Sequence, residues 1–194
     1  PHGGPASRDN RAALDIWRQY LAHLGYSVFQ PNFRGSTGYG GKFAAAGKRE
    51  WGGKMQTDIV DGVTHLIEQG LADEKQLAIL GISYGGYAAL MGALDETPYQ
   101  CTVSINGVSD LPGVLSVEQI SGSFDYWYEH IGADMLTEED LLRRSPLRRA
   151  DEYEIPVLLI HGTLDITVQK GQSAELAKEL SRLGKDVTTL WLEK

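Results

Sequence analysis

A serine flanked by glycines stands between a strand-like and a helix-like segment. Gly81-Ile82-Ser83-Tyr84-Gly85 reads G-x-S-x-G, directly after the apolar run Leu77–Leu80 and directly before a helical pattern. Glycines on both sides permit a tight strand-to-helix turn, because neighbouring Cβ atoms would leave no room. Such a turn presents the hydroxyl at the strand tip as a nucleophile for acyl transfer, with strained backbone torsions. We therefore predict Ser83 as a nucleophile. The alternative interpretation is a glycine-rich turn without chemistry.

An acidic residue follows a later apolar run. Asp165 ends the sequence His161-Gly162-Thr163-Leu164-Asp165, after the run Pro156–Ile160. In a parallel sheet this position lies at the same edge as Ser83. Hydrolases with this type of serine turn carry their triad in the order serine, acid, histidine. We predict Asp165 as the acid, and the alternatives are Asp110, Asp125 or no triad at all. His161 precedes the acid by only four residues, so we interpret it as structural.

A second glycine loop opens the chain as Pro1-His2-Gly3-Gly4-Pro5. Glycine lets the backbone approach a developing oxyanion with no side chain in the way. The N–H of Tyr84, just after the serine, lies at a helix N-terminus, where the helix dipole favours negative charge. We predict that the N–H groups of Gly4 and Tyr84 form an oxyanion hole. Taken alone, the loop is equally compatible with an ordinary turn.

Alternating helical and strand patterns position these residues. The strand-like runs are continuously apolar, which is typical of a parallel sheet with helices on both faces and predicts an α/β fold. Strands are expected at Ser27–Gln30, Leu77–Leu80, around Val103, at Pro156–Ile160 and at Val187–Trp191. Helices are expected through Leu14 to Leu24, Ile59 to Ile67, Ala88–Met91, Glu138–Arg144 and Gly171–Leu183. The stretch Phe124–Tyr128 is expected to be irregular. Its Tyr126-Trp127-Tyr128 cluster either packs against the core or lines a pocket.

Composition bounds the possible partners. The 194 residues suit one domain, and a formal charge of −8 disfavours nucleic acid and anionic membrane surfaces. No apolar run reaches the length of a membrane span. The single Cys101 lies in an apolar run, which predicts a buried, inert thiol. We expect no metal site, because the chain has one cysteine and its histidines are scattered. We expect no phosphate site, because the loop Arg34–Gly41 lacks a Gly-Lys-Ser/Thr ending. The sequence therefore predicts no cofactor.

Five motifs occur in one order along the chain. They are H-G-G-P at His2–Pro5, N-x-R-G-S-x-G-Y-G at Asn32–Gly40, G-x-S-Y-G-G-Y at Gly81–Tyr87, Ser145-Pro146-Leu147, and H-G-x-x-D-x-x-V at His161–Val168. With these motifs the chain resembles the catalytic domain of the prolyl oligopeptidase family, and most closely its acylaminoacyl-peptidase and dipeptidyl-peptidase branch. The acid loop departs from the family pattern, because Gln169 follows Val168 where the family usually has proline.

The resemblance implies an α/β-hydrolase fold, incomplete at both ends, in a serine peptidase that acts on short peptides. It further implies an N-terminal β-propeller in the same parent chain and a triad histidine beyond Lys194. None of His2, His23, His65, His130 and His161 occupies the family's position for that histidine. The strand leading into the first glycine loop would lie between Val28 and Ile79, so we expect these two residues not to pair.

Other interpretations remain at this stage. A carboxylesterase shares the serine turn and the oxyanion loop, and a catalytically silent domain used for binding or dimerisation shares the fold. We expect a cytoplasmic protein, and we leave a homo-oligomer open.

Overall fold

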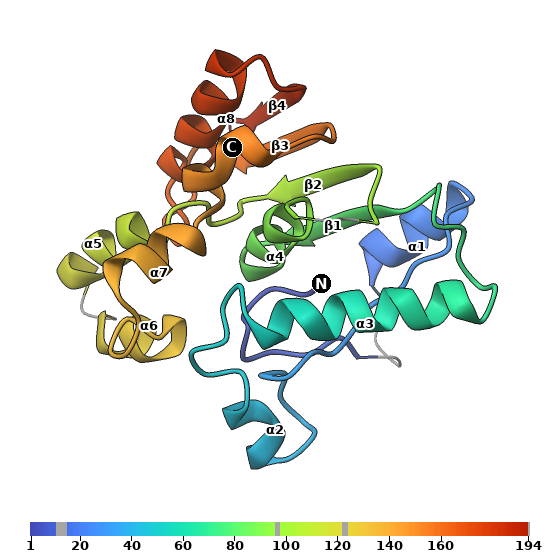
Figure 1. The fold of residues 1–194 in the computed structure, drawn as a ribbon, viewed down its shortest axis with the longest axis horizontal. Helices are drawn as coiled ribbons and strands as arrows, with labels where there is room; N and C mark the ends of the chain where they lie inside the picture. Colours follow the sequence, from blue (N-terminus) through green and yellow to red (C-terminus); the bar gives the residue numbers. More distant parts are fainter. Residues whose placement is uncertain (11–14, 96–97, 122–123, 194) are drawn as a thin grey trace.

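The computed structural model describes residues 1–10, 15–95, 98–121 and 124–193, so Leu14 of the first predicted helix lies outside the described residues. Within these ranges, four strands form one sheet in the order β1-β2-β3-β4 (Figure 1). The strands are β1 Ala78–Ile82, β2 Cys101–Ile105, β3 Val157–Gly162 and β4 Val187–Leu192. All neighbours pair in parallel, so the carboxyl ends of the strands share one edge of the sheet.

Helices alternate with these strands, as the sequence pattern predicts. They are α1 Ile16–His23, α2 Gly41–Ala45, α3 Lys54–Glu68, α4 Tyr84–Gly92, α5 Leu111–Ser121, α6 Phe124–Ile131, α7 Glu138–Arg143, the 3₁₀ helix η1 Pro146–Glu152 and α8 Gly171–Arg182. Figure 1 shows α5, α6 and α7 gathered in a group beside the sheet. Helix α5 was not anticipated from the sequence.

Helices α4 and α8 cover the same face of the sheet. On that face, Thr102 of β2 donates its hydroxyl hydrogen to the carbonyl of Ala89 in α4, and His161 of β3 contacts Ser173 in α8. On the opposite face Ile105 is buried, but four other side chains are only half-buried, namely Leu80, Val103, Leu158 and Ile160. The parallel α/β architecture is therefore confirmed. Helical cover of the second face is partial in the described part of the chain.

The predicted strand Ser27–Gln30 is wrong, because this segment belongs to no strand of the described sheet. A strand needs a hydrogen-bonded neighbour, and in the described sheet β1 pairs with β2 alone, so no strand stands beside Ser27–Gln30. The segment packs against α3: a Cβ built on Gly62 would meet the Phe29 ring at 2.7 Å. The expected lack of pairing between Val28 and Ile79 is confirmed.

The aromatic stretch is helical rather than irregular, because Phe124–Tyr128 begins α6. Helical spacing places Tyr126 over His130, with ring centroids 3.8 Å apart. Trp127 packs edge-on against Trp51 of the core at 6.0 Å. Packing is thus the correct interpretation for Trp127, whereas Tyr126 and Tyr128 are exposed.

The sequence also predicts a buried thiol at Cys101 and no membrane span. The thiol of Cys101 is free, but it is half-buried rather than buried, because the residue begins β2 at the end of the sheet. Among the described helices, none combines the length and the apolarity that a membrane crossing requires.

Candidate active site

Ser83 occupies a strained turn between β1 and α4. Its φ of 58° and ψ of −120° lie in a region that non-glycine residues rarely adopt, at a cost on the order of 1–3 kcal/mol. The flanking glycines make the turn possible, because a Cβ on Gly81 would lie 2.0 Å from the carbonyl oxygen of Gly85. The Ser83 N–H donates to the carbonyl of Ile105 in β2 at 2.9 Å. The predicted strained elbow is confirmed.

The side chain of Tyr84 is part of the core, so only its backbone N–H is left for the predicted oxyanion hole. The phenol is buried, its hydroxyl faces the Met55 sulfur at 3.6 Å, and burial raises its pKa well above the usual value. Tyr84 is the first residue of α4, where backbone N–H groups have no acceptor within the helix. The first bond of the turn runs from Tyr87 N–H to the Ser83 carbonyl at 3.1 Å.

The N-terminal glycine loop lies against the nucleophile. A Cβ on Gly3 would stand 3.5 Å from the Cβ of Ser83, and Gly4, with φ of 125°, follows directly. His2 fixes the loop: its Nδ1 donates to the Gly3 carbonyl at 2.7 Å, and its Nε2 lies 2.8 Å from the Ser36 hydroxyl. Burial lowers the pKa of His2, which favours the neutral ring, so Nε2 accepts from Ser36.

Asp165 follows β3 and lies at the same sheet edge as Ser83, as predicted, with the end of β2 between them. Its Oδ1 accepts hydrogen bonds from the N–H groups of Thr167 and Val168 at 2.8 and 2.9 Å. These bonds close the turn after the acid even though Gln169 replaces the family's proline. Oδ2 accepts a hydrogen bond from the side-chain amide of Asn106 at 2.5 Å. A gap between Asp165 and Ser83 wide enough for one imidazole stays a prediction.

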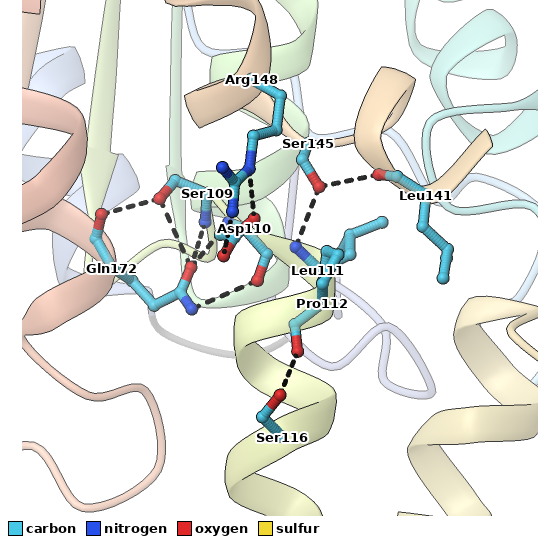
Figure 2. Close-up of polar contacts among 9 residues, drawn as sticks. All are labelled: Ser109, Asp110, Leu111, Pro112, Ser116, Leu141, Ser145, Arg148 and Gln172. Carbon is cyan, nitrogen blue, oxygen red and sulfur yellow. Dashed lines mark hydrogen bonds and ion pairs between the residues drawn. The ribbon is translucent and has the colours of Figure 1, made fainter. Parts of the chain in front are cut away.

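The alternative acids are placed differently. Figure 2 shows Asp110 at the start of α5, where Arg148 Nε donates to its carboxylate at 3.0 Å. The Asp110 backbone N–H donates to the Gln172 side chain at 2.7 Å. The carboxylate thus faces a guanidinium, which leaves it poorly placed to orient an imidazole. Asp125 is exposed on α6.

His161 has a structural role, as the sequence indicates. The ring is buried, and Nε2 lies 2.8 Å from the Val168 carbonyl, which can only accept. Nε2 is therefore a donor, and Nδ1 lies 2.7 Å from the Ser173 hydroxyl. Because both ring nitrogens are engaged within the fold, His161 has no nitrogen available to deprotonate Ser83.

A cavity of about 220 Å³ lies beside the acid loop, between α5 and α8. Its lining includes Val114, Val117, Leu147, Thr167, Val168 and Gln172. The Tyr126-Trp127-Tyr128 cluster is not among the lining residues. Throughout the described ranges, no group of three or more His, Cys, Asp or Glu side chains is arranged to hold a metal ion.

Asn106 is the residue at this edge that sequence reasoning missed. It follows β2 directly and has a φ of 47°, which asparagine tolerates better than most residues. An asparagine immediately after a buried strand was the only signal available, and it does not reveal the partner of the side chain.

Comparisons with known proteins identify the family of the chain. The sequence profile of the prolyl oligopeptidase family matches residues 13–194. The chain is 39% identical to dipeptidyl aminopeptidase BIII of Pseudoxanthomonas mexicana, over 96% of the chain and 28% of that protein. It is 37% identical to dipeptidyl peptidase family member 6 of Caenorhabditis elegans, over 97% of the chain and 26% of that protein. The chain therefore spans little more than a quarter of the length of these curated relatives.

Solved structures give the same result. An acylaminoacyl peptidase of Pyrococcus horikoshii superposes with a TM-score of 0.90 at 30% identity, covering 100% of this chain and 32% of that one. A puromycin-hydrolyzing peptidase of Mycobacterium tuberculosis superposes with a TM-score of 0.88 at 32% identity, covering 98% of this chain and 29% of that one.

Proposed function

The chain belongs to the prolyl oligopeptidase family, and on that premise we propose that it supplies the nucleophile and the acid of a serine peptidase that hydrolyses short peptides. The observation that carries the proposal is the backbone of Ser83, which is strained at the turn between β1 and α4, with Gly3 against it. The names of the relatives, a dipeptidyl aminopeptidase and an acylaminoacyl peptidase, support a peptide substrate.

The proposed reaction is acyl transfer through an ester of Ser83. The hydroxyl oxygen attacks the scissile carbonyl carbon, and its proton passes to a histidine outside these 194 residues, which Asp165 orients. The N–H groups of Gly4 and Tyr84 bind the oxyanion of the tetrahedral intermediate. The histidine then protonates the leaving amine, the C–N bond breaks, and the acyl ester forms. Water, deprotonated by the same histidine, attacks this ester and releases the acid and free Ser83. The reaction requires no cofactor.

The remainder of the full-length protein is part of the proposal. We propose an N-terminal β-propeller in the same chain that admits short peptides and excludes folded proteins, which the greater length of the relatives supports. The cytoplasmic location and a homo-oligomer stay predictions.

A comparison of serine variants tests the nucleophile in the full-length protein. Ser83→Ala should abolish labelling by a fluorophosphonate and lower turnover of a chromogenic dipeptide by on the order of a millionfold, because the attacking hydroxyl is gone. Ser181→Ala, at an exposed serine of α8, is the matched control and should retain both activities. Undiminished labelling of the Ser83→Ala variant would contradict the assignment. Turnover of simple esters without any turnover of peptides would favour a carboxylesterase.

A further inference from the structure

The end of β2 contacts both halves of the proposed catalytic machinery. In the sheet order β1-β2-β3-β4, this strand separates β1, which leads to Ser83, from β3, which leads to Asp165. Ile105 is its last residue and Asn106 follows. The contacts of these two consecutive residues point in opposite directions along the sheet edge.

Toward β1, the contact is with the nucleophile itself. The carbonyl of Ile105 accepts the hydrogen bond from the backbone N–H of Ser83 at 2.9 Å. This bond extends the parallel ladder of β1 and β2 by one residue beyond Ile82, into the strained turn. The position of Ser83 is therefore tied to the end of β2.

Toward β3, the contacts are with the acid and its strand. The backbone N–H of Asn106 donates to the carbonyl of Ile160 at 2.8 Å. Its side-chain oxygen accepts from the N–H of Gly162 at 2.9 Å, and its side-chain amide donates to Oδ2 of Asp165 at 2.5 Å. The two partners fix the orientation of the amide, because a backbone N–H can bond only to its oxygen and a carboxylate only to its nitrogen.

The hydrogen bonds around Asp165 leave little freedom to its carboxylate. A carboxylate has about four acceptor sites, two on each oxygen. Both sites on Oδ1 are taken by the N–H groups of Thr167 and Val168, and one site on Oδ2 is taken by Asn106. One site on Oδ2 remains, and it is the site that an imidazole N–H would use. The bond from Asn106 therefore leaves one lone pair of Oδ2 for an imidazole N–H.

We propose that Asn106 is a positioning residue, which holds the carboxylate of Asp165 in register with Ser83 through the end of β2. This inference rests on the proposed function and deepens it, because it assigns the device that sets the distance between nucleophile and acid. The residue acts through Asp165 and touches no substrate. Its left-handed φ of 47° aims the side chain along the sheet edge toward the acid loop.

Two substitutions in the full-length protein separate the side chain from the backbone. Asn106→Gly keeps a residue that tolerates positive φ but removes the amide. The acid loses one anchor, so we expect kcat to fall about 10- to 100-fold with KM within about twofold, since small displacements of catalytic groups cost rates of this order. Asp95→Gly is the matched control, because Asp95 also has a positive φ, of 57°, and also loses a hydrogen bond, to Arg149. It should leave kcat unchanged.

Asn106→Asp provides a readout that a purely structural role would not change. The introduced carboxyl has nearly the shape of the amide and, when protonated, donates the same hydrogen bond to Asp165. When ionised it repels Asp165, and the pair of carboxyls shares one proton with a raised apparent pKa. The ratio of variant to wild-type kcat/KM should therefore fall as the pH rises through that pKa, which a pH profile of both proteins measures.

The outcomes are distinguishable. If wild-type Ser83 is labelled by the fluorophosphonate, but Asn106→Gly retains wild-type kcat or the Asn106→Asp ratio is independent of pH, the positioning role is overturned and the proposed function stands. If wild-type Ser83 is not labelled, the proposed function itself fails. Thermal unfolding of each variant identifies a loss of fold. Should Asn106→Gly not fold, the pH profile of the near-isosteric Asn106→Asp variant decides alone.

Discussion

The strained backbone of Ser83 depends on the absence of side chains at the neighbouring glycines. Ser83 keeps its unfavourable torsions because backbone atoms on both sides of the turn approach closely where side chains would otherwise stand. The carbonyl of Gly85 lies where a Cβ of Gly81 would be, and backbone cannot move aside as a flexible side chain can. The strain at Ser83 is thus maintained by packing that any larger residue at Gly81 would disrupt.

We predict that Gly81→Ala destabilises the full-length protein by about 3 kcal/mol or more, because overpacking against backbone costs at least the amounts measured in protein cores. Gly171→Ala is the matched control, since no heavy atom apart from its chain neighbours and the adjacent helix backbone lies within 4 Å of its Cβ position, and it begins α8. There alanine should be neutral or stabilise by up to about 1 kcal/mol. Denaturant unfolding measures both, and equal stability of the two variants would contradict the packing argument.

The site was predictable from sequence only where its geometry is local. Ser83 and its glycines lie within five residues, and Asp165 closes a turn with its own neighbours, so short motifs indicate both. Asn106 bonds to residues more than fifty positions away. No local pattern specifies such a partner, which is why the sequence did not reveal it.

At the scale of elements, an ion pair joins α3 to the loop that follows Phe33. Arg34 donates to Asp58 from its backbone N–H at 2.8 Å and from its guanidinium at 2.7 and 2.6 Å. Burial, the largest single influence, would raise the pKa of Asp58, but the hydrogen bonds from Arg34 and its positive charge together outweigh burial and lower the pKa. The loop also carries Ser36, which holds His2 beside the nucleophile.

We predict that this pair contributes to stability against acid. Because the pKa of Asp58 is lower in the folded state, its contribution is complete above the pKa of an unfolded aspartate, about 3.9, and is lost as the pH falls through the lower folded value. Asp58→Asn should therefore weaken the pH dependence of the free energy of unfolding in this acid range. Asp61→Asn, at an exposed residue of the same helix, is the control. Denaturant midpoints across the acid range provide the measurement, and parallel curves for wild type and Asp58→Asn would refute it.

The sequence predicted correctly those helices and strands whose caps and hydrophobic pattern are all visible in the local sequence. Helix α7 has a capping box between Thr137 and Asp140, and the apolar run at Val157–Gly162 has no competing helical period. The segment Ser27–Gln30 has a strand-like composition, but strand formation also depends on a neighbour, which composition does not report. For α6, aromatic residues obscured a helical spacing that the stacking of Tyr126 and His130 makes evident.

At the scale of the whole molecule, apolar side chains lie at the surface of α1. None of its residues is buried, and Ile16, Trp17 and Tyr20 are 75%, 54% and 55% exposed. At the other end of the fold, Leu190 and Leu192 of β4 are 50% and 46% exposed. Exposed apolar patches are usually covered by another segment or partner. This agrees with the proposal that the chain is part of a longer protein.

We predict that residues 1–194 produced alone bind a hydrophobic dye and self-associate, whereas the full-length protein does so far less, because in it the surface of α1 is covered. Dye fluorescence and sedimentation measure both.

We also predict that residues 1–194 alone hydrolyse peptides at no more than a small residual rate. A serine hydroxyl is almost wholly protonated at neutral pH, and His2 and His161 already use both ring nitrogens within the fold. Peptidase activity of the segment equal to that of the full-length protein would show that a histidine within these residues serves as the base, and the proposed mechanism would have to be abandoned.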